Sequence, residues 1–360
     1  MIMADDVANQ PAETNPKDVD PGLSGSGVIP IDNRSIKPMD AIGEAARKIL
    51  LYQFEIMLKQ SAKIRTKNQV DDKYHRTAVH DMRVAVRRMR SAIKLLGAYY
   101  KKDTALNRHR KTLKVLGVVL GNVRDMTVFI DDLDAFVKTL PTNTPASELD
   151  GGAQEDSNDS NDNHSQEWRD QLDTEWRQAE KALEKFLDSG RYANLVEDFR
   201  VFLMTPGAGS RSIEESQPYQ VRHVLPPLIY QDYTTVRAYE TSLDNASLNT
   251  LHALRIACKR LRYTLEFFTD VLGHEALQVI EATKAMQDYL GQIQDAQVHR
   301  ELLEDYAKHV HNRQTLALLL KYLEASETVK NELRIDVPVA WEKFASDSVR
   351  RALAHAVEVL

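Results

Sequence analysis

Hydrophobic residues recur every three or four positions along most of the chain, beginning near Met39. This spacing predicts amphipathic helices, because one helical turn contains 3.6 residues. Alternating runs rich in β-branched residues, which would indicate strands, are absent. The sequence therefore predicts an all-α protein of ten to twelve helices. Their expected ranges are 39–70, 71–99, 103–121, 123–138, 168–187, 192–203, 219–242, 247–271, 274–290, 293–310, 312–333 and 339–358.

Two stretches lack this periodicity. Residues 1–38 are rich in Pro, Gly, Ser, Asp and Asn, which predicts a disordered tail. Residues 141–166 contain Gly-Gly and repeated Ser-Asn-Asp, which is typical of a flexible acidic linker. The linker would divide one domain, 39–355, into a first half at about 39–140 and a second half at about 167–355.

Two of the predicted helices carry the same basic stripe, each led by a histidine. The first reads HDMRVAVRRMR from His80, and the second reads HALRIACKRLR from His252. At about 100° per residue, the stripe occupies roughly a quarter of each helix circumference. Like charges repel one another unless an anion lies between them, so the repeated stripe indicates an anion site built by two related halves. The stripes consist of His80, Arg83, Arg87 and Arg90, and of His252, Arg255, Lys259 and Arg262.

The side of each motif helix opposite the stripe is apolar, which predicts that it is buried. In the first helix this face contains Met82, Ala85, Val86, Met89, Ala92, Ile93 and Leu96. In the second it contains Leu254, Ala257, Cys258, Leu261, Leu265 and Phe268.

A second duplicated segment follows each stripe by about 40 residues, as LGNVRDMTV from Leu120 and LGQIQDAQV from Leu290. We expect its aspartates, Asp125 and Asp295, to pair with arginines of the motif helices. Its glycines, Gly121 and Gly291, would allow close helix packing, and a helix break is predicted after each. Position 124 is arginine where the second copy has Gln294, so it adds charge to one half only.

The candidate anion-binding residues fall into groups of different geometry. The stripe cations are the principal candidates, and Lys114 and Lys284 occupy matching places in the helices that follow. Arg88 and Arg260 point about 80° to the other side of the histidines, towards either a flanking groove or a salt bridge. His80 and His252 are either phosphate ligands or structural hydrogen-bonding residues. No catalytic residue or cofactor is predicted. A metal site is not predicted either, because no second histidine or acid lies at i+4 from the motif histidine in both copies.

Charge and cysteine content refine this picture. The net charge is −6, but residues 80–114 hold eleven Lys or Arg against two acids, and residues 148–175 hold ten acids against one Arg. Cys258 is the single cysteine, so no disulfide framework is expected, which fits a reducing compartment. The N-terminal residues do not resemble a secretory signal, and no apolar run is long enough to cross a bilayer. The sequence predicts a cytoplasmic protein with no membrane contact.

The two stripes and the two LG-x-x-x-D segments resemble the CHAD domain family (conserved histidine α-helical domain). The resemblance covers about residues 40–355 and implies two pseudo-twofold-related helical bundles with a central basic channel or groove. It further implies binding of inorganic polyphosphate and association with polyphosphate granules, whose proteins become candidate partners. Many relatives carry a fused CYTH-type domain with a Glu-x-Glu-x-Lys motif, which this sequence lacks, so a non-enzymatic, stand-alone binding protein is expected. The alternative is an RNA or DNA backbone binder, although the stripes contain no aromatic residue for base stacking.

Overall fold

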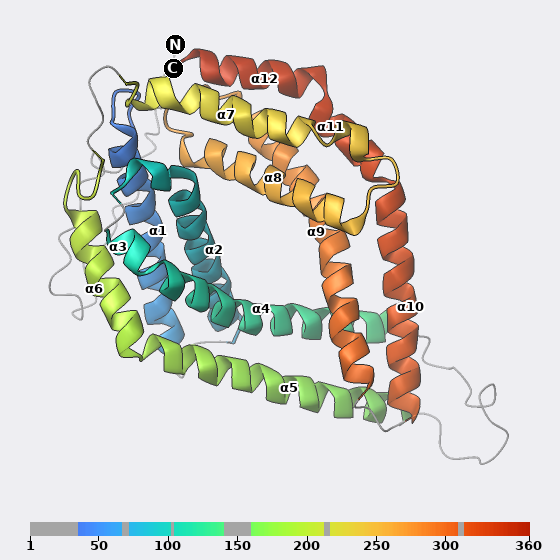
Figure 1. Ribbon diagram of the computed structural model, residues 1–360. Coiled ribbons are helices and arrows are strands. Elements are labelled where there is room, and N and C mark those ends of the chain that lie inside the picture. Colours follow the sequence, from blue (N-terminus) through green and yellow to red (C-terminus); the bar gives the residue numbers. More distant parts are fainter. Residues whose placement is uncertain (1–34, 67–71, 102–103, 140–159, 212–216, 309–312) are drawn as a thin grey trace, which may run out of the picture. The chain divides into compact units, whose positions relative to one another are not determined.

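The computed structural model describes residues 35–66, 72–101, 104–139, 160–211, 217–308 and 313–360 (Figure 1). These residues form α-helices with short 3₁₀ turns and contain no strand, which confirms the all-α class. The predicted tail, apart from residues 35–38, and residues 141–159 of the predicted linker lie outside the described residues.

The helices of the first half are α1 (Ile42–Arg65), α2 (Asp72–Leu96), α3 (Ala105–Arg108), α4 (Arg110–Thr139), α5 (Ser160–Leu187) and α6 (Gly190–Met204). In this half, the basic stripe lies on α2 and the LG-x-x-x-D segment lies on α4. The helices of the second half are α7 (Val221–Arg237), α8 (Leu248–Phe267), α9 (Ala276–Ala307), α10 (Arg313–Ile335), α11 (Val337–Ala345) and α12 (Asp347–Glu358).

Several predicted boundaries are wrong. Helix α4 continues through Gly121 and α9 through Gly291, so neither glycine breaks its helix. An internal glycine weakens a helix by only about 1 kcal/mol, and packing along the rest of a long helix outweighs this loss. Helix α5 begins at Ser160, so the last part of the predicted linker is helical. The single helix expected at 339–358 is two helices, because the side chain of Ser346 caps the start of α12.

The order of helix contacts repeats between the halves. Helix α2 packs against α1 and α4, just as α8 packs against α7 and α9. In the first half α4 also packs on α5, and in the second half α9 also packs on α10, so each half forms a series of helices in contact. The two series meet where α2 contacts α8. The arrangement as two bundles about a pseudo-twofold axis stays a prediction, and the repeated contact order is what it requires.

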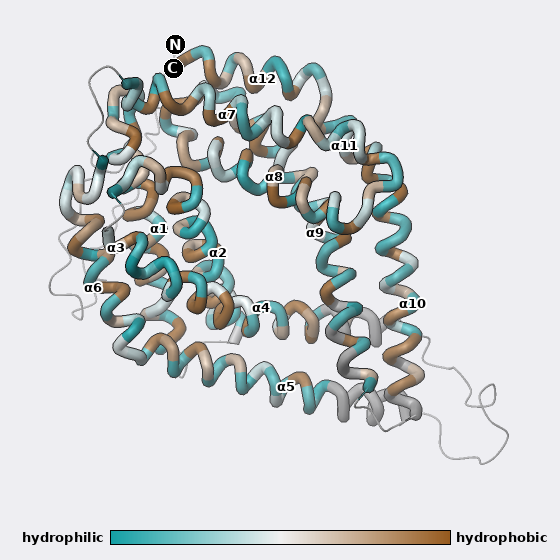
Figure 2. The backbone as a smooth tube through the Cα atoms, viewed as in Figure 1, coloured by the Kyte–Doolittle hydropathy of each residue, from teal (hydrophilic) through white to brown (hydrophobic). Residues whose placement is uncertain are grey.

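Hydrophobic and hydrophilic residues are mixed along each helix, as Figure 2 shows, and the buried hydrophobic residues form the core. All thirteen residues of the predicted apolar faces of α2 and α8 are buried. A further apolar cluster joins α4, α5, α9 and α10. No helix in the described part of the chain has the length and apolar character needed to cross a membrane. The residues of the four-helix cluster are Phe129, Leu172, Leu303, Leu319 and Tyr322.

Candidate functional site

Burial of the apolar faces of α2 and α8 leaves their basic stripes to meet where the two helices touch. Lys259 shows this most directly. Its pKa is lowered to about 8, first by burial and then by repulsion from arginines on both helices. Arg87 and Arg90 belong to α2, whereas Arg255 and Arg262 flank Lys259 on α8 itself. The two stripes therefore form one basic cluster, consisting of Arg87, Arg90, Arg255, Lys259 and Arg262.

Within the part of the chain that the structure describes, most cations of the basic cluster have no counterion. Among the described residues, Arg87, Arg90, Arg255 and Lys259 form no ion pair with a carboxylate. The Nε atoms of Arg87 and Arg255 are buried and have no hydrogen-bond partner there. Burying an unpaired charge is unfavourable, and a polyanion that neutralised several of these cations at once would remove the penalty.

One acid that the sequence did not predict lies in the basic cluster. Glu266 on α8 forms an ion pair with Arg88 of α2 and another with Arg262, whose Nε lies 3.5 Å from Glu266 Oε1. The buried ring of Tyr263 supports both guanidinium groups, which lie 5.7 Å and 5.1 Å from its centroid. Arg88 thus makes the salt bridge that was one of its two expected roles. Glu266 stands where the first copy has Lys94, so the repeat provided no signal for it.

Arg260 is the counterpart of Arg88, and it also forms a salt bridge. Its Nε lies 2.7 Å from Oδ1 of Asp232 on α7. Burial raises the pKa of Asp232, although hydrogen bonds from Thr264 and Arg260 favour its charged form. Arg260 keeps a side chain that is 47% exposed, so its guanidinium remains accessible beside the cluster while fixing α8 to α7.

The glycines of the second motif lie directly against motif arginines. A Cβ atom built on Gly121 would lie 3.9 Å from Arg83 Nε, and one on Gly291 would lie 3.6 Å from Arg255 Nε. The guanidinium of Arg83 is also held by Asp125, with 3.2 Å between Nη2 and Oδ1. The expected pairing of an aspartate with a motif arginine is therefore present in the first half. Asp295 forms no ion pair within the described residues.

Arg90 lies close to α4 as well, because a Cβ built on Gly117 would approach its Nη1 to 2.9 Å. Lys114 lies one turn before Gly117 on the same side of α4. The repeat places Lys284 at the matching point of α9. Both lysine side chains are exposed.

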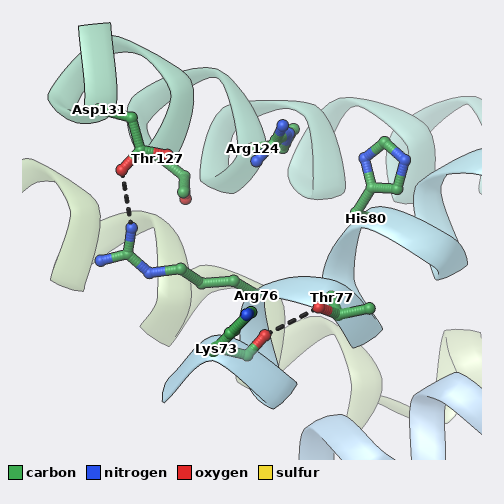
Figure 3. Close-up of a pocket in the computed structure, with 7 residues that line it drawn as sticks. All are labelled: Lys73, Arg76, Thr77, His80, Arg124, Thr127 and Asp131. Carbon is green, nitrogen blue, oxygen red and sulfur yellow. Dashed lines mark hydrogen bonds and ion pairs between the residues drawn. The ribbon is translucent and has the colours of Figure 1, made fainter. Parts of the chain in front are cut away.

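The two motif histidines face position 124 or its counterpart. Nδ1 of His252 lies 2.6 Å from Oε1 of Gln294, so the ring hydrogen-bonds across to α9. His80 instead faces Arg124 across a pocket between α2 and α4 (Figure 3). Burial and then the charge of Arg124 lower the pKa of His80; Arg87 and Arg83 lower it further, whereas Asp81 raises it.

The single cysteine, Cys258, is buried. Burial raises the pKa of the Cys258 thiol to about 12, which agrees with a hydrophobic role for this residue. Within the described ranges, no three His, Cys, Asp or Glu side chains gather as a group that could hold a metal ion.

Comparison with solved structures supports the fold. The crystal structure of the CHAD domain from the plant Ricinus communis is similar with a TM-score of 0.58 and 21% identity, covering 89% of this chain and 94% of that chain. PptA from Streptomyces chartreusis is similar with a TM-score of 0.55 and 14% identity, covering 87% of this chain and 99% of that chain. At such identities the likeness shows the fold alone.

No curated protein matches the sequence. The family whose description is CHAD domain matches residues 48–304, a range that contains both basic stripes and both LG-x-x-x-D segments. Since that match spans well over half of the chain, the protein belongs to the CHAD domain family.

Proposed function

We propose that this protein binds inorganic polyphosphate through the basic cluster, without catalysing a reaction, and thereby associates with polyphosphate granules and their proteins. The observation that carries the proposal is the placement of Lys259 among four arginines from two helices. The CHAD domain family is linked to polyphosphate, which supports this choice of anion.

The chemistry of the cluster suits a chain of phosphates. Each phosphate offers oxygens that accept charge-assisted hydrogen bonds, and a guanidinium can donate two in parallel. Along one helix face the cations recur every three or four residues, which spaces them by about 5–6 Å. A flexible linear polyanion with one charge per phosphate can therefore contact several cations in turn, without recognition of any base.

A nucleic acid is the competing ligand, and the position of Tyr263 argues against it. Proteins that bind single strands without sequence preference stack bases on exposed aromatic rings. Tyr263 is the aromatic residue nearest the second stripe in sequence, and it is 2% exposed beneath the guanidinium groups of Arg88 and Arg262. Its ring offers no free face for a base.

The test is a titration of the full chain with long-chain polyphosphate and, separately, with single-stranded RNA of equal charge, at two salt concentrations. We expect polyphosphate to bind more tightly, with an affinity that falls as salt rises because bound counterions are released. RNA binding of equal or greater strength would overturn the proposal in favour of a nucleic-acid backbone site.

A charge-reversal variant locates the site. Arg87→Glu combined with Lys259→Glu should weaken polyphosphate binding by more than about 100-fold at low salt, because it replaces attraction by repulsion at two adjacent points. The control reverses the same number of charges at exposed lysines of α5 and α11, as Lys185→Glu with Lys343→Glu. Equal losses in both variants would mean that net charge, and not the basic cluster, governs binding.

A further inference from the structure

A pocket of about 460 Å³ lies between α2 and α4, next to the first stripe but outside the basic cluster. Figure 3 shows Lys73 and Arg76 on the α2 side, with Arg124 and Asp131 on α4 and His80 at one end. Three side chains in this lining carry permanent positive charge, and a single acid opposes them. The pocket is therefore electropositive whether His80 is charged or neutral.

The second half contains the equivalent pocket, of about 330 Å³, between α8 and α9. The repeat places Leu248 at the position of Arg76, Gln294 at that of Arg124, and Glu301 at that of Asp131. None of the residues lining this second pocket is a lysine or arginine. Since corresponding helices of the two halves form the two pockets, the fold does not require cations at these positions. The positive charge belongs to the first pocket specifically.

We infer that the pocket between α2 and α4 is a second anion site, which takes a phosphate or diphosphate group, supplied either as the end of a polyphosphate chain or as a free ion. The site does not depend on whether the basic cluster binds polyphosphate.

The side chains of this pocket are arranged to receive such a group. Arg124 forms no hydrogen bond or ion pair with any other described residue, so its donors remain open for phosphate oxygens. The guanidinium of Arg76 is held in place by Asp131, at 3.3 Å from Nη1 to Oδ1, and by the ring of Trp176, whose centroid is 5.9 Å away. An arginine oriented in advance loses less entropy when it binds an oxyanion.

The electrostatic state of His80 supports this assignment. The His80 ring faces Arg124, which lies on α4. On α2 it lies beside Asp81, Arg83 and Arg87. It shares the pocket with Lys73, Arg76 and Asp131. Burial, followed by the charges of neighbouring arginines, holds its pKa below the ordinary value of 6.5. A phosphate in the pocket would offset their charge and favour the imidazolium, which can then donate a hydrogen bond to it.

The experiment measures binding of pyrophosphate to the full chain by calorimetry at low salt, in the wild type and in Arg124→Gln. This substitution introduces the residue that the second half already carries at the same point, so the fold tolerates it. We expect saturable binding to the wild type and a loss of about 10-fold or more in the variant, since one charged donor group disappears. Lys73→Gln, at an exposed side chain, provides a second variant with a loss in the same direction.

Lys343→Gln on α11 is the matched control, because it removes one exposed charge from a helix that does not line the pocket. The inference fails if the wild type does not bind pyrophosphate, or if Arg124→Gln and Lys343→Gln bind it equally well.

Two further titrations distinguish the source of the phosphate group. If orthophosphate binds wild type and its binding is lost in Arg124→Gln, the pocket is a site for the free ion. If orthophosphate does not bind, but tripolyphosphate loses more affinity than long-chain polyphosphate in that variant, the pocket takes chain ends. The charge-reversed Arg87 and Lys259 variant reports on the basic cluster separately, so either site can fail without the other.

Discussion

Raising the pH from 7 to 9 should weaken polyphosphate binding through one residue, Lys259. In the free protein its pKa is about 8, because burial and the four surrounding arginines disfavour the ammonium form. A bound polyphosphate offsets the charge of those arginines and so restores the pKa towards the ordinary value of 10.5. Binding therefore favours the protonated lysine, and above pH 8 it must be accompanied by proton uptake.

The size of the effect follows from the two pKa values. At pH 7 Lys259 is already charged in the free protein, and binding requires almost no proton. At pH 9 about ten molecules in eleven are neutral at this position, and protonating them weakens the observed affinity by about 10-fold. Burial and then the charge of Arg124 lower the pKa of His80, so in the free protein this residue titrates at lower pH than Lys259.

Calorimetric titration with long-chain polyphosphate in two buffers of different ionisation enthalpy, at pH 7, 8 and 9, measures both the affinity and the proton uptake. The control is Lys259→Arg, which keeps the charge at all three pH values, since arginine does not titrate here. We expect the variant to bind with an affinity independent of pH. An equal loss of affinity in the wild type and in Lys259→Arg would refute the placement of Lys259 at the centre of the site.

Three further outcomes are expected from substitutions elsewhere. Glu266→Gln should strengthen polyphosphate binding several-fold at low salt and lower the free energy of unfolding by about 1–3 kcal/mol. Titration with polyphosphate measures the first effect and urea denaturation the second, and an unchanged value in either assay would contradict the role of Glu266. Glu180→Ala should lower the free energy of unfolding by about 1–3 kcal/mol, because the Glu180 carboxylate and the His75 ring form a buried hydrogen bond of 2.8 Å, and an unchanged free energy of unfolding would contradict that role. Gly291→Ala should raise this free energy by up to about 1 kcal/mol through helix propensity, whereas Gly291→Leu should lower it by displacing Arg255, and thermal unfolding distinguishes the two signs.

The sequence predicted the class of fold and the principal cations of the basic cluster, because both depend on local periodicity. All thirteen residues assigned to the apolar faces of α2 and α8 are buried, and a helix with one buried face must present its other face elsewhere. Helix ends were less predictable. Gly121 and Gly291 were expected to end helices, yet each lies inside one, since a preference of about 1 kcal/mol is smaller than the packing energy of a long helix.

The sequence did not predict most of the interactions that join different helices. Arg88 had two open roles, and its partner Glu266 lies 178 positions away along the chain. The repeat did not predict the cationic pocket, because Lys73 and Arg76 have no basic counterparts in the second copy. The signal for them was their spacing from His80, since Arg76 lies one turn and Lys73 two turns before it on the same face of the helix.

By itself, the amino-acid sequence determined that the chain forms amphipathic helices and that two of them carry matching rows of cations, because helical periodicity is a property of neighbouring residues. Only the tertiary structure decided that the two rows meet around Lys259, that Glu266 neutralises part of the cluster, and that one of two equivalent pockets is positively charged. These features depend on the distances between helices, and charges interact through space with a strength that falls with distance, whatever their separation along the chain.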